Sequence, residues 1–327
     1  MAREAEEKPR LTLDALIVIQ VDVPSGSHQS SLCLRDSVAS RTVPGLLMLE
    51  LDLQILDSII SIALQEDLGF GDITTQAVVS PNMKARGEFV AKQDFVLAGW
   101  PVVVRTFHHV SERITVESAC RDGDAVAKGS IFGSVAGPAA RLLSGERVAL
   151  NFLQRLSGVA TLTRQFAEAI SGTGTTILDT RKTTPGLRAL EKYAVRMGGG
   201  KNHRFGLSDG VLIKENHITA AGGVAEAIRK ARAAIDHLKK IEIEVTTFEE
   251  LNQALDAGAD AILLDNMTPG QVKEAVQQTS GRVPLEVSGG IHLGNVREYA
   301  LTGVDFISVG ALTHSFKSTD ISLELKM

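Results

Sequence analysis

The chain has 327 residues, of which 44% are hydrophobic and 22% are charged, and its formal net charge is -5 at pH 7. This composition is typical of a globular protein and excludes a chain that is disordered throughout. The negative net charge disfavours nucleic acid as the main partner and favours small ligands.

Residues 1–47 differ from the rest, because an acidic start and a short apolar run precede a loop-rich segment without periodicity. Acids stand where a secretory or organelle signal would carry basic residues, and no apolar run approaches the roughly 20 residues that span a bilayer. Cys33 and Cys120 lack metal-ligand spacing and predict neither a disulfide framework nor a zinc site. We expect a poorly ordered extension, native translation from Met48, and a cytoplasmic protein.

The next hundred residues predict a module of mixed structure. The stretch MLELDLQILDSIISIALQEDLGFGD opens with the apolar spacing of an amphipathic helix. Residues 84–137 are strand-like and rich in turns. Helical spacing follows from Pro138, with Gly145 and Gly158 as breakers, which predicts two consecutive helices that lead into a second domain.

The second domain alternates strands and helices. The expected strands are TTILDT, GVLIK, IEIEVT, AILLDN, PLEVSGG and FISVGAL. Segments such as FEELNQALDAG and TPGQVKEAVQQT lie between them and have helical spacing. This alternation predicts a parallel sheet, and we expect strands that are apolar on both faces, covered by helices or closed into a barrel.

Polar residues follow the apolar part of every expected strand, where a parallel α/β architecture places its active site. They are Asp179, Thr180, Arg181, Lys214, Glu244, Asp265, Ser288 and Gly310. Because the pattern repeats, we expect most of them to line one pocket.

Positive charge is concentrated between Thr180 and Lys214, with eight Lys or Arg residues against two acids. Arg188, Lys192 and Arg196 have the spacing of a solvated helix face. Arg181 and Lys182 instead follow an apolar run and precede a Thr-Thr-Pro-Gly turn, and we interpret them as ligand-binding residues.

Small residues end the last two strands, in SGGI and SVGAL, where backbone N–H groups often bind phosphate. Together with the cationic segment they imply a phosphorylated substrate. Glu244 and Asp265 would then serve Mg²⁺ and ribose hydroxyls, or alternatively pair with Lys214 or Arg181. His203 lies between cations, which we expect to disfavour its protonation and leave a neutral donor.

Several long motifs resemble quinolinate phosphoribosyltransferase, the decarboxylating nicotinate-nucleotide pyrophosphorylase. They are EDLGFGDITT, SGERVALNFLQRLSGVATLT, LDTRKTTPGLRALEKYAVRMGGGKNHRFGLSDGVLIKENHI, EIEVTTFEEL, ILLDNM and EVSGGI. The resemblance covers the chain from about Met48 to the end. It implies an N-terminal α/β sandwich domain at residues 48–158 and an incomplete α/β barrel of parallel strands at 159–327. The last residues would pack back on the first domain.

The resemblance also implies residue roles. Lys182, Glu244 and Asp265 would be catalytic, with Mg²⁺ as the cofactor at the two carboxylates. The remaining substrate-binding positions would be Arg147, Thr180, Arg181, His203, Arg204, Lys214, Ser288, Gly289, Gly290 and Gly310. Arg147 would reach across from a neighbouring subunit, in a homodimer or a dimer-based hexamer.

The reaction implied is transfer of the phosphoribosyl group of phosphoribosyl pyrophosphate to quinolinate with loss of CO2, a step of de novo NAD biosynthesis. One alternative is a Schiff-base aldolase on the same barrel, with Lys182 or Lys214 as nucleophile. Another is a paralogue of the molybdenum-transport-associated type that is not catalytic or has another specificity. Nicotinate as acceptor is disfavoured, because a monocarboxylate would leave cations unmatched.

Overall fold

The computed structural model of the protein describes residues 51–326. The expectations for residues 1–47, for a start at Met48 and for Cys33 therefore concern residues outside the described part. Across residues 51–326, no helix combines the length and the apolar character that membrane crossing requires.

The described chain begins with two helices whose first turns are capped by aspartates. Helix α1 (Leu53–Leu68) starts where the Asp52 carboxylate accepts the Gln54 N–H at 2.8 Å, and it buries one apolar stripe, as the sequence predicted. Helix α2 (Ile73–Val78) starts in the same way at Asp72.

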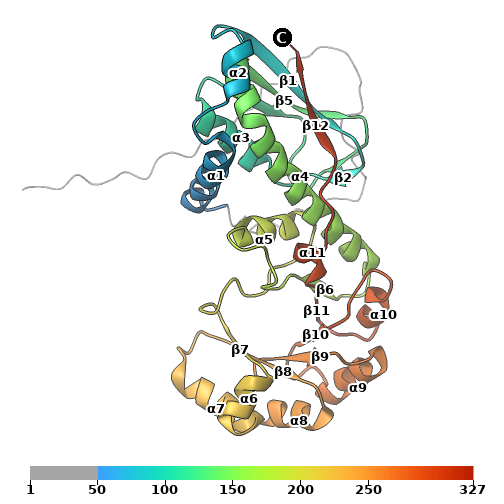
Figure 1. Cartoon of the computed structure of the whole chain (residues 1–327). Coiled ribbons are helices and arrows are strands. Elements are labelled where there is room, and N and C mark those ends of the chain that lie inside the picture. Colours follow the sequence, from blue (N-terminus) through green and yellow to red (C-terminus); the bar gives the residue numbers. More distant parts are fainter. Residues whose placement is uncertain (1–50, 327) are drawn as a thin grey trace, which may run out of the picture. The chain divides into compact units, whose positions relative to one another are not determined.

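A four-stranded antiparallel sheet forms the body of the N-terminal part, in the order β12-β1-β5-β3. Its strands are β1 (Lys84–Ala91), β3 (Thr115–Ser118), β5 (Ile131–Pro138) and β12 (Ile321–Lys326). A small second sheet pairs β2 (Phe95–Val96) with β4 (Ala125–Val126). Strand β12 comes from the end of the chain, so the C-terminus returns to the first sheet (Figure 1).

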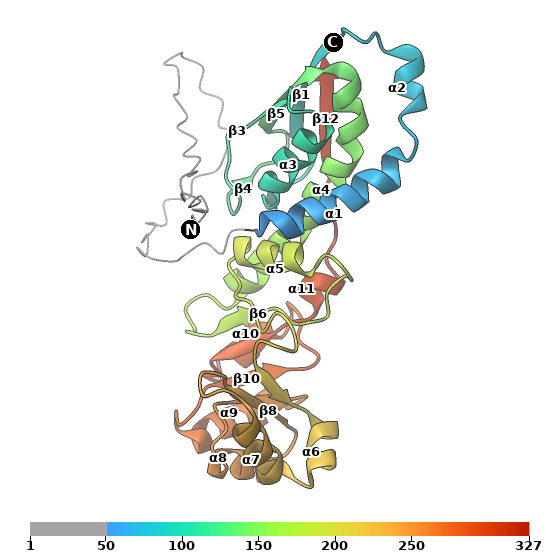
Figure 2. The same cartoon turned by 90° about the vertical axis from the view of Figure 1, so that its left-hand side faces the viewer.

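One helix interrupts the stretch that the sequence predicted as strand-like. Helix α3 (Trp100–Val110) has Pro101 in its first turn and buries Val102, Val103 and Phe107. It packs along α4, as two views of the chain show (Figures 1 and 2).

Helix α4 (Ala139–Ala169) is one continuous helix of 31 residues, so the prediction of two helices was wrong. Both glycines that suggested a break are buried inside it. A Cβ at Gly145 would lie 3.2 Å from the ring of Phe107, and one at Gly158 would clash with the carbonyl oxygen of Lys317. These glycines allow close packing of neighbouring chain and do not end the helix.

The C-terminal part is a parallel six-stranded sheet in the order β6-β11-β10-β9-β8-β7. Its strands are β6 (Thr176–Leu178), β7 (Val211–Ile213), β8 (Ile241–Val245), β9 (Ala261–Asp265), β10 (Leu285–Ser288) and β11 (Phe306–Ser308). Because the first strand pairs with the last, only the pairing between β6 and β7 is missing from a closed ring. This is the incomplete α/β barrel expected from the sequence.

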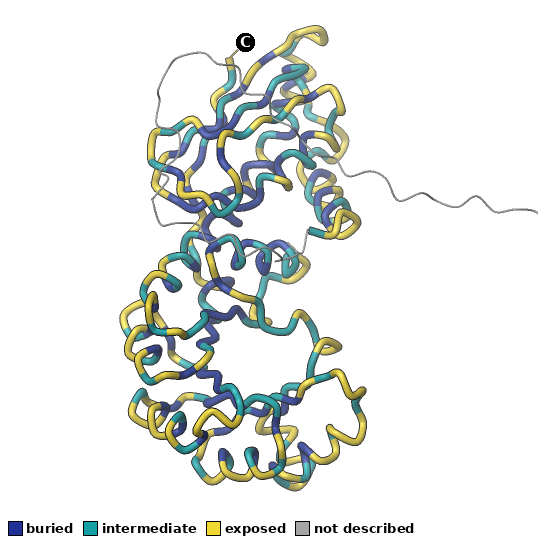
Figure 3. The backbone as a smooth tube through the Cα atoms, turned by 180° about the vertical axis from the view of Figure 1, so that it is seen from behind, coloured by how far each residue is buried: buried dark blue, intermediate teal, exposed yellow. Residues whose placement is uncertain are grey.

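Helices connect the barrel strands. They are α5 (Arg188–Met197), α6 (Glu215–Ala221), α7 (Val224–Ala234), α8 (Phe248–Asp256), α9 (Pro269–Thr279), α10 (Val296–Ala300) and α11 (Ala311–His314). Buried backbone follows the strands, whereas exposed backbone is concentrated on the helices and loops around them (Figure 3).

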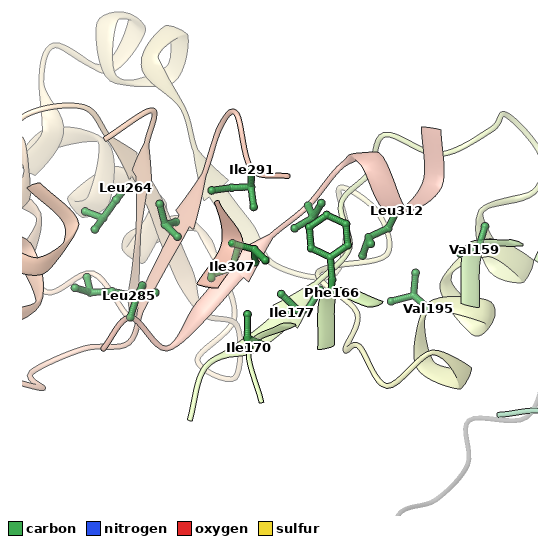
Figure 4. Packing of buried hydrophobic residues seen from close by; sticks show 14 of the residues in the cluster. Val159, Phe166, Ile170, Ile177, Val195, Leu264, Leu285, Ile291, Ile307 and Leu312 are labelled. Carbon is green, nitrogen blue, oxygen red and sulfur yellow. The ribbon is translucent and has the colours of Figure 1, made fainter. Parts of the chain in front are cut away.

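One apolar cluster holds the barrel to α4. Ile177 of β6, Ile307 of β11 and Phe166 of α4 are each at most 2% exposed and belong to this cluster (Figure 4). Burial of a large apolar side chain contributes about 1.5–3 kcal/mol. The barrel strand that carries the cationic segment is thus anchored on a rigid helix.

Candidate active site

Charged and apolar residues share the inner face of the barrel, so the expectation of strands that are apolar on both faces was wrong for β8 and β10. In β8, Ile241, Ile243 and Val245 are fully buried on one face, and Glu242 and Glu244 lie on the other. The parallel register aligns Ser288 of β10 with Asp265 of β9 on this face, whereas Glu244 and Glu286 are each aligned with the apolar Leu263. The apolar faces pack on the helices, and the opposite face can bind a charged ligand.

Three predicted residues meet at the ends of neighbouring strands. The Lys214 ammonium pairs with the Glu244 carboxylate, which is the ion pair considered as an alternative from the sequence. Burial raises the pKa of Asp265, and the charge of Glu244 raises it further, while Lys214 and Lys182 oppose the shift. These groups therefore share one electrostatic environment.

Lys182 lies beside the loop that follows β11. A Cβ at Gly310 would lie 3.1 Å from Cδ of Lys182. The Thr180 hydroxyl accepts the Lys182 N–H at 3.0 Å and fixes the turn between them. A cavity of about 570 Å³ opens here, lined by Arg155, Lys182, Thr183, Thr184, Thr313, His314, Phe316 and Ser318.

His314 is a residue that the sequence analysis did not identify as a candidate. It lines this cavity, and its ring lies against Gly310, one helical turn earlier. Its position four residues after the glycine of SVGAL was the available signal.

The loop after β10 has the backbone expected of a phosphate-binding turn. Gly289 and Gly290 have φ of +98° and +63°, and a Cβ at Gly289 would clash with the Asn266 side chain. Ser288, at the end of β10, precedes this turn on the inner face. Only glycine fits these positions without strain, and successive N–H groups in such a turn can form an anion-binding concavity.

The segment from Lys201 to Arg204 runs along the free edge of β6. The Lys201 N–H donates to the Ile177 carbonyl at 2.9 Å, and Lys201 forms a parallel bridge with Leu178. This places Arg204 near Arg181, which the sequence placed at the end of β6.

Within residues 51–326 Arg204 forms no direct ion pair, although the charges of Glu242 and Asp209 act on it from a greater distance. Burial lowers the pKa of its guanidinium, and the charge of Arg181 lowers it further. One nitrogen donates to the Gly210 carbonyl at 2.9 Å, but the buried Nε has no hydrogen-bond partner in the described part of the chain. Buried polar groups are normally paired, so this arrangement is suited to an anionic ligand.

His203 contacts two carboxylates that sequence reasoning missed. Its Nε2 lies 3.1 Å from Oε2 of Glu242 and 3.7 Å from Oε2 of Glu286, and its Nδ1 accepts the Arg204 N–H at 2.7 Å. Burial lowers the pKa of His203, but the Glu242 hydrogen bond and the charge of Glu286 outweigh it and raise the pKa overall. The expectation of disfavoured protonation was wrong, because neighbours in space outweigh neighbours in sequence. The alternation in IEIEV was a signal for Glu242.

Lys192 does not belong to a solvated helix face. It is 2% exposed, and its ammonium lies 2.5 Å from the carboxylate of Asp179, which is fully buried. Asp179 also accepts the His203 N–H at 2.8 Å, and Lys192 donates to the His203 carbonyl at 3.0 Å. The pair fixes the cationic loop to β6 and does not line the pocket.

The two other cations of that helix are also turned toward the protein. Arg188 donates to the Thr183 hydroxyl and to the Phe205 carbonyl, and Arg196 donates to the Asn202 amide oxygen. The helix bears charge on its inner face because loops with free carbonyl oxygens cover it.

Arg147 is exposed on α4 and makes no ion pair among the described residues. The structure of one chain does not bring it to the other predicted positions, so its role remains the prediction that a second subunit provides the contact.

Comparison with known proteins matches both parts of the chain. The family model for the N-terminal domain of quinolinate phosphoribosyl transferase matches residues 72–157, and that for the C-terminal domain matches residues 159–324. The chain is 47% identical to a probable nicotinate-nucleotide pyrophosphorylase [carboxylating] of Bacillus subtilis over 262 residues, which are 80% of this chain and 90% of the relative. It is 43% identical to quinolinate phosphoribosyltransferase [decarboxylating] 2b of Nicotiana tabacum, over 83% of this chain and 82% of the relative.

Solved structures agree. The nicotinate-nucleotide pyrophosphorylase of Francisella tularensis superposes with a TM-score of 0.82 at 40% identity, covering 85% of this chain and 99% of that one. The enzyme of Ehrlichia chaffeensis has a TM-score of 0.79 at 43% identity, covering 82% and 98%. This chain belongs to the quinolinate phosphoribosyltransferase family.

Proposed function

We propose that the protein transfers the phosphoribosyl group of phosphoribosyl pyrophosphate to quinolinate and releases pyrophosphate and CO2, giving nicotinate mononucleotide for NAD biosynthesis. The observation that carries this proposal is Arg204, a half-buried cation with an unpartnered Nε beside a second cation, Arg181. Quinolinate carries two adjacent carboxylates and would match both guanidinium groups. Family membership supports the same reaction.

Binding of the pyridine would rest on the loop along β6. Arg181, Arg204 and His203 would hold its carboxylates, with help from Lys182 and Lys214. Arginine suits this role because its planar donors pair with a carboxylate through two bonds. A fixed ring places the pyridine nitrogen for attack on the ribose, so orientation supplies much of the acceleration.

Binding of the sugar phosphate would use the ends of strands β8 to β11, away from the loop along β6. The backbone N–H groups from Ser288 to Gly290 and at Gly310 would hold the 5′-phosphate. Glu244 and Asp265 would face the ribose hydroxyls and the positive charge that develops at the ribosyl carbon as pyrophosphate leaves. No covalent enzyme intermediate is required.

The carboxylates of Glu244 and Asp265 also fit Mg²⁺, because hard oxygen ligands from adjacent strands face the same space and the Glu244 charge raises the pKa of Asp265. When bound, Mg²⁺ would neutralise the departing pyrophosphate. Lys214 already pairs with Glu244, so displacement of its ammonium would accompany direct coordination.

Loss of CO2 follows from the charge of the product. Once the pyridine nitrogen is alkylated it is cationic, and the positive ring stabilises the electron pair that remains on the ring carbon when the adjacent carboxylate departs as CO2. A proton from solvent then adds to that carbon and gives the nicotinate ring. Arg181, His203 and Arg204, which together form a carboxylate clamp, would hold the ring through this step. The Schiff-base alternative is less well supported, since the Lys214 ammonium is held by an ion pair and lacks the apolar surroundings of a reactive amine.

A second subunit would complete the site through Arg147. Its exposed position on α4, away from an ion pair, supports a contact supplied in a homodimer or a dimer-based hexamer. The cytoplasmic location remains a prediction from the sequence.

The direct test mixes the purified protein with quinolinate, phosphoribosyl pyrophosphate and Mg²⁺. We expect pyrophosphate, CO2 and nicotinate mononucleotide in equal amounts, dependent on both substrates. Nicotinate in place of quinolinate is the matched control and should give little product. Failure to form product from quinolinate would refute the proposal.

A further inference from the structure

The groups behind His203 suggest how the protein accommodates a dianion above two buried acids, and this inference rests on the proposed function. Glu242 from β8 and Glu286 from β10 lie on the inner face of the barrel. Their carboxylate oxygens and Nε2 of His203 all lie within 4.8 Å of one another. Two carboxylates at this spacing repel each other and any approaching anion.

Hydrogen bonds define where the proton of His203 lies. Nδ1 accepts the Arg204 N–H, so the ring proton is on Nε2 and points to Glu242. This donor is also the one that a substrate carboxylate would use. In the free protein, Glu242 therefore accepts the hydrogen bond that Nε2 of His203 would otherwise donate to quinolinate.

Glu286 is the place where an added proton can be held. Its side chain is 3% exposed, and within the described residues its Oε1 has no hydrogen-bond partner. Burial and, after it, the charge of Glu242 raise the pKa of Glu286, while the charge of His203 and a hydrogen bond from Ser308 lower it, and the net result is a pKa of about 7.

The surroundings of Glu286 provide little other compensation. In register with it, β9 places Leu263 and β11 places Phe306. Besides Glu242 and His203 themselves, two cations face the cluster: the Lys192 ammonium, which lowers the pKa of His203, and the Arg204 guanidinium, which interacts with the charge of Glu242.

We propose that quinolinate binding is coupled to uptake of one proton by Glu286. The hydrogen bond from Nε2 of His203 to Glu242 breaks, and one from Nε2 to a substrate carboxylate forms. A proton from the buffered solvent adds to Glu286 and stays on it, and the protonated Glu286 donates a hydrogen bond to Glu242. The cluster then presents one negative charge fewer to the dianion, and Glu286 is a positioning residue that acts through Glu242 and His203.

Isothermal titration calorimetry tests this coupling. Quinolinate is titrated at pH 7.5 in PIPES and in Tris, which differ in ionisation enthalpy, with the protein alone and with inorganic pyrophosphate and Mg²⁺ present to fill the second site without turnover. The difference in heat between buffers gives the number of protons taken up. For a group with a pKa near 7 we expect more than about half a proton for each quinolinate bound.

The decisive variant is Glu286→Gln, whose amide can donate to Glu242 permanently. In the wild type, coupled proton uptake should make the Kd for quinolinate rise between pH 7 and 8.5. In Glu286→Gln we expect proton uptake to fall close to zero and this rise in Kd to be absent. Glu274→Gln, at an exposed position on α9, is the matched control and should keep wild-type uptake.

A second variant keeps the proposal testable if Glu286→Gln does not fold. Ser308→Ala removes the hydrogen bond that lowers the pKa of Glu286, so the rise in Kd should move to higher pH. Uptake that persists in Glu286→Gln would assign the proton to His203 and overturn the proposal, as would wild-type binding without uptake. A wild-type protein that binds no quinolinate would instead refute the proposed function.

Discussion

Removal of the Arg204 side chain tests the carboxylate clamp directly. The side chain donates to the Gly210 carbonyl and has an unpartnered, buried Nε. Breaking one member of a buried charge pair costs about 3–5 kcal/mol. Because each 1.36 kcal/mol is about tenfold in rate, Arg204→Ala should lower kcat/KM for quinolinate by at least about 150-fold.

The same change should leave the fold nearly as stable as before. Loss of one hydrogen bond costs about 1 kcal/mol. Relief of the repulsion by Arg181 and removal of the unpartnered Nε act in the opposite direction. We therefore expect the free energy of unfolding to change by less than about 1 kcal/mol, as at other sites where function and stability conflict.

Steady-state rates of nicotinate mononucleotide formation and urea unfolding together give the answer. Arg229→Ala is the control, since Arg229 is exposed on α7 and pairs only with Glu226 among the described residues. It should keep wild-type rates. The reasoning fails if Arg204→Ala keeps kcat/KM within about threefold of wild type, or if it unfolds several kcal/mol more easily.

Three further outcomes are expected. Lys192→Met leaves Asp179 buried without its cation, so urea unfolding should give a loss of about 3–5 kcal/mol, and the added change Asp179→Asn should restore part of it. The pKa of Glu286 is about 7 in the folded state against an ordinary value of 4.5, so between these pH values the folded state binds a proton that the unfolded state does not. The free energy of unfolding should therefore fall by about 3 kcal/mol as pH rises from about 4.5 to 7. In urea titrations Glu286→Gln should lack this dependence on pH. Arg147→Ala and Arg181→Ala should each be inactive alone, and mixing and reassociating the two proteins should recover up to about a quarter of the activity, whereas no recovery would contradict a shared site.

The strands and most helices of the barrel could be predicted from local pattern. Alternating apolar runs and helical spacing are set by neighbours within about ten residues, so segments such as IEIEVT and FEELNQALDAG form the expected elements. Helix α4 could not be predicted as continuous, because the role of Gly158 depends on Lys317, far along the chain. The sequence alone does not distinguish a glycine that ends a helix from one that lets another segment pack closely against the helix.

The sequence by itself determined which chemical groups are present: a cationic segment, carboxylates after the strands, and small residues at strand ends of the kind that often bind phosphate. It determined this because residues at strand ends meet whenever parallel strands close into a barrel. Only the tertiary structure decided which charges are free to act. Lys192 and Asp179 neutralise each other in the interior, and the Nε of Arg204 has no hydrogen-bond partner among the described residues. Glu242 and Glu286 raise the pKa of His203, which is opposite to the direction expected from its neighbours in sequence. The sequence states which residues can carry a charge, but the energy of each charge depends on its burial and on its partners in space.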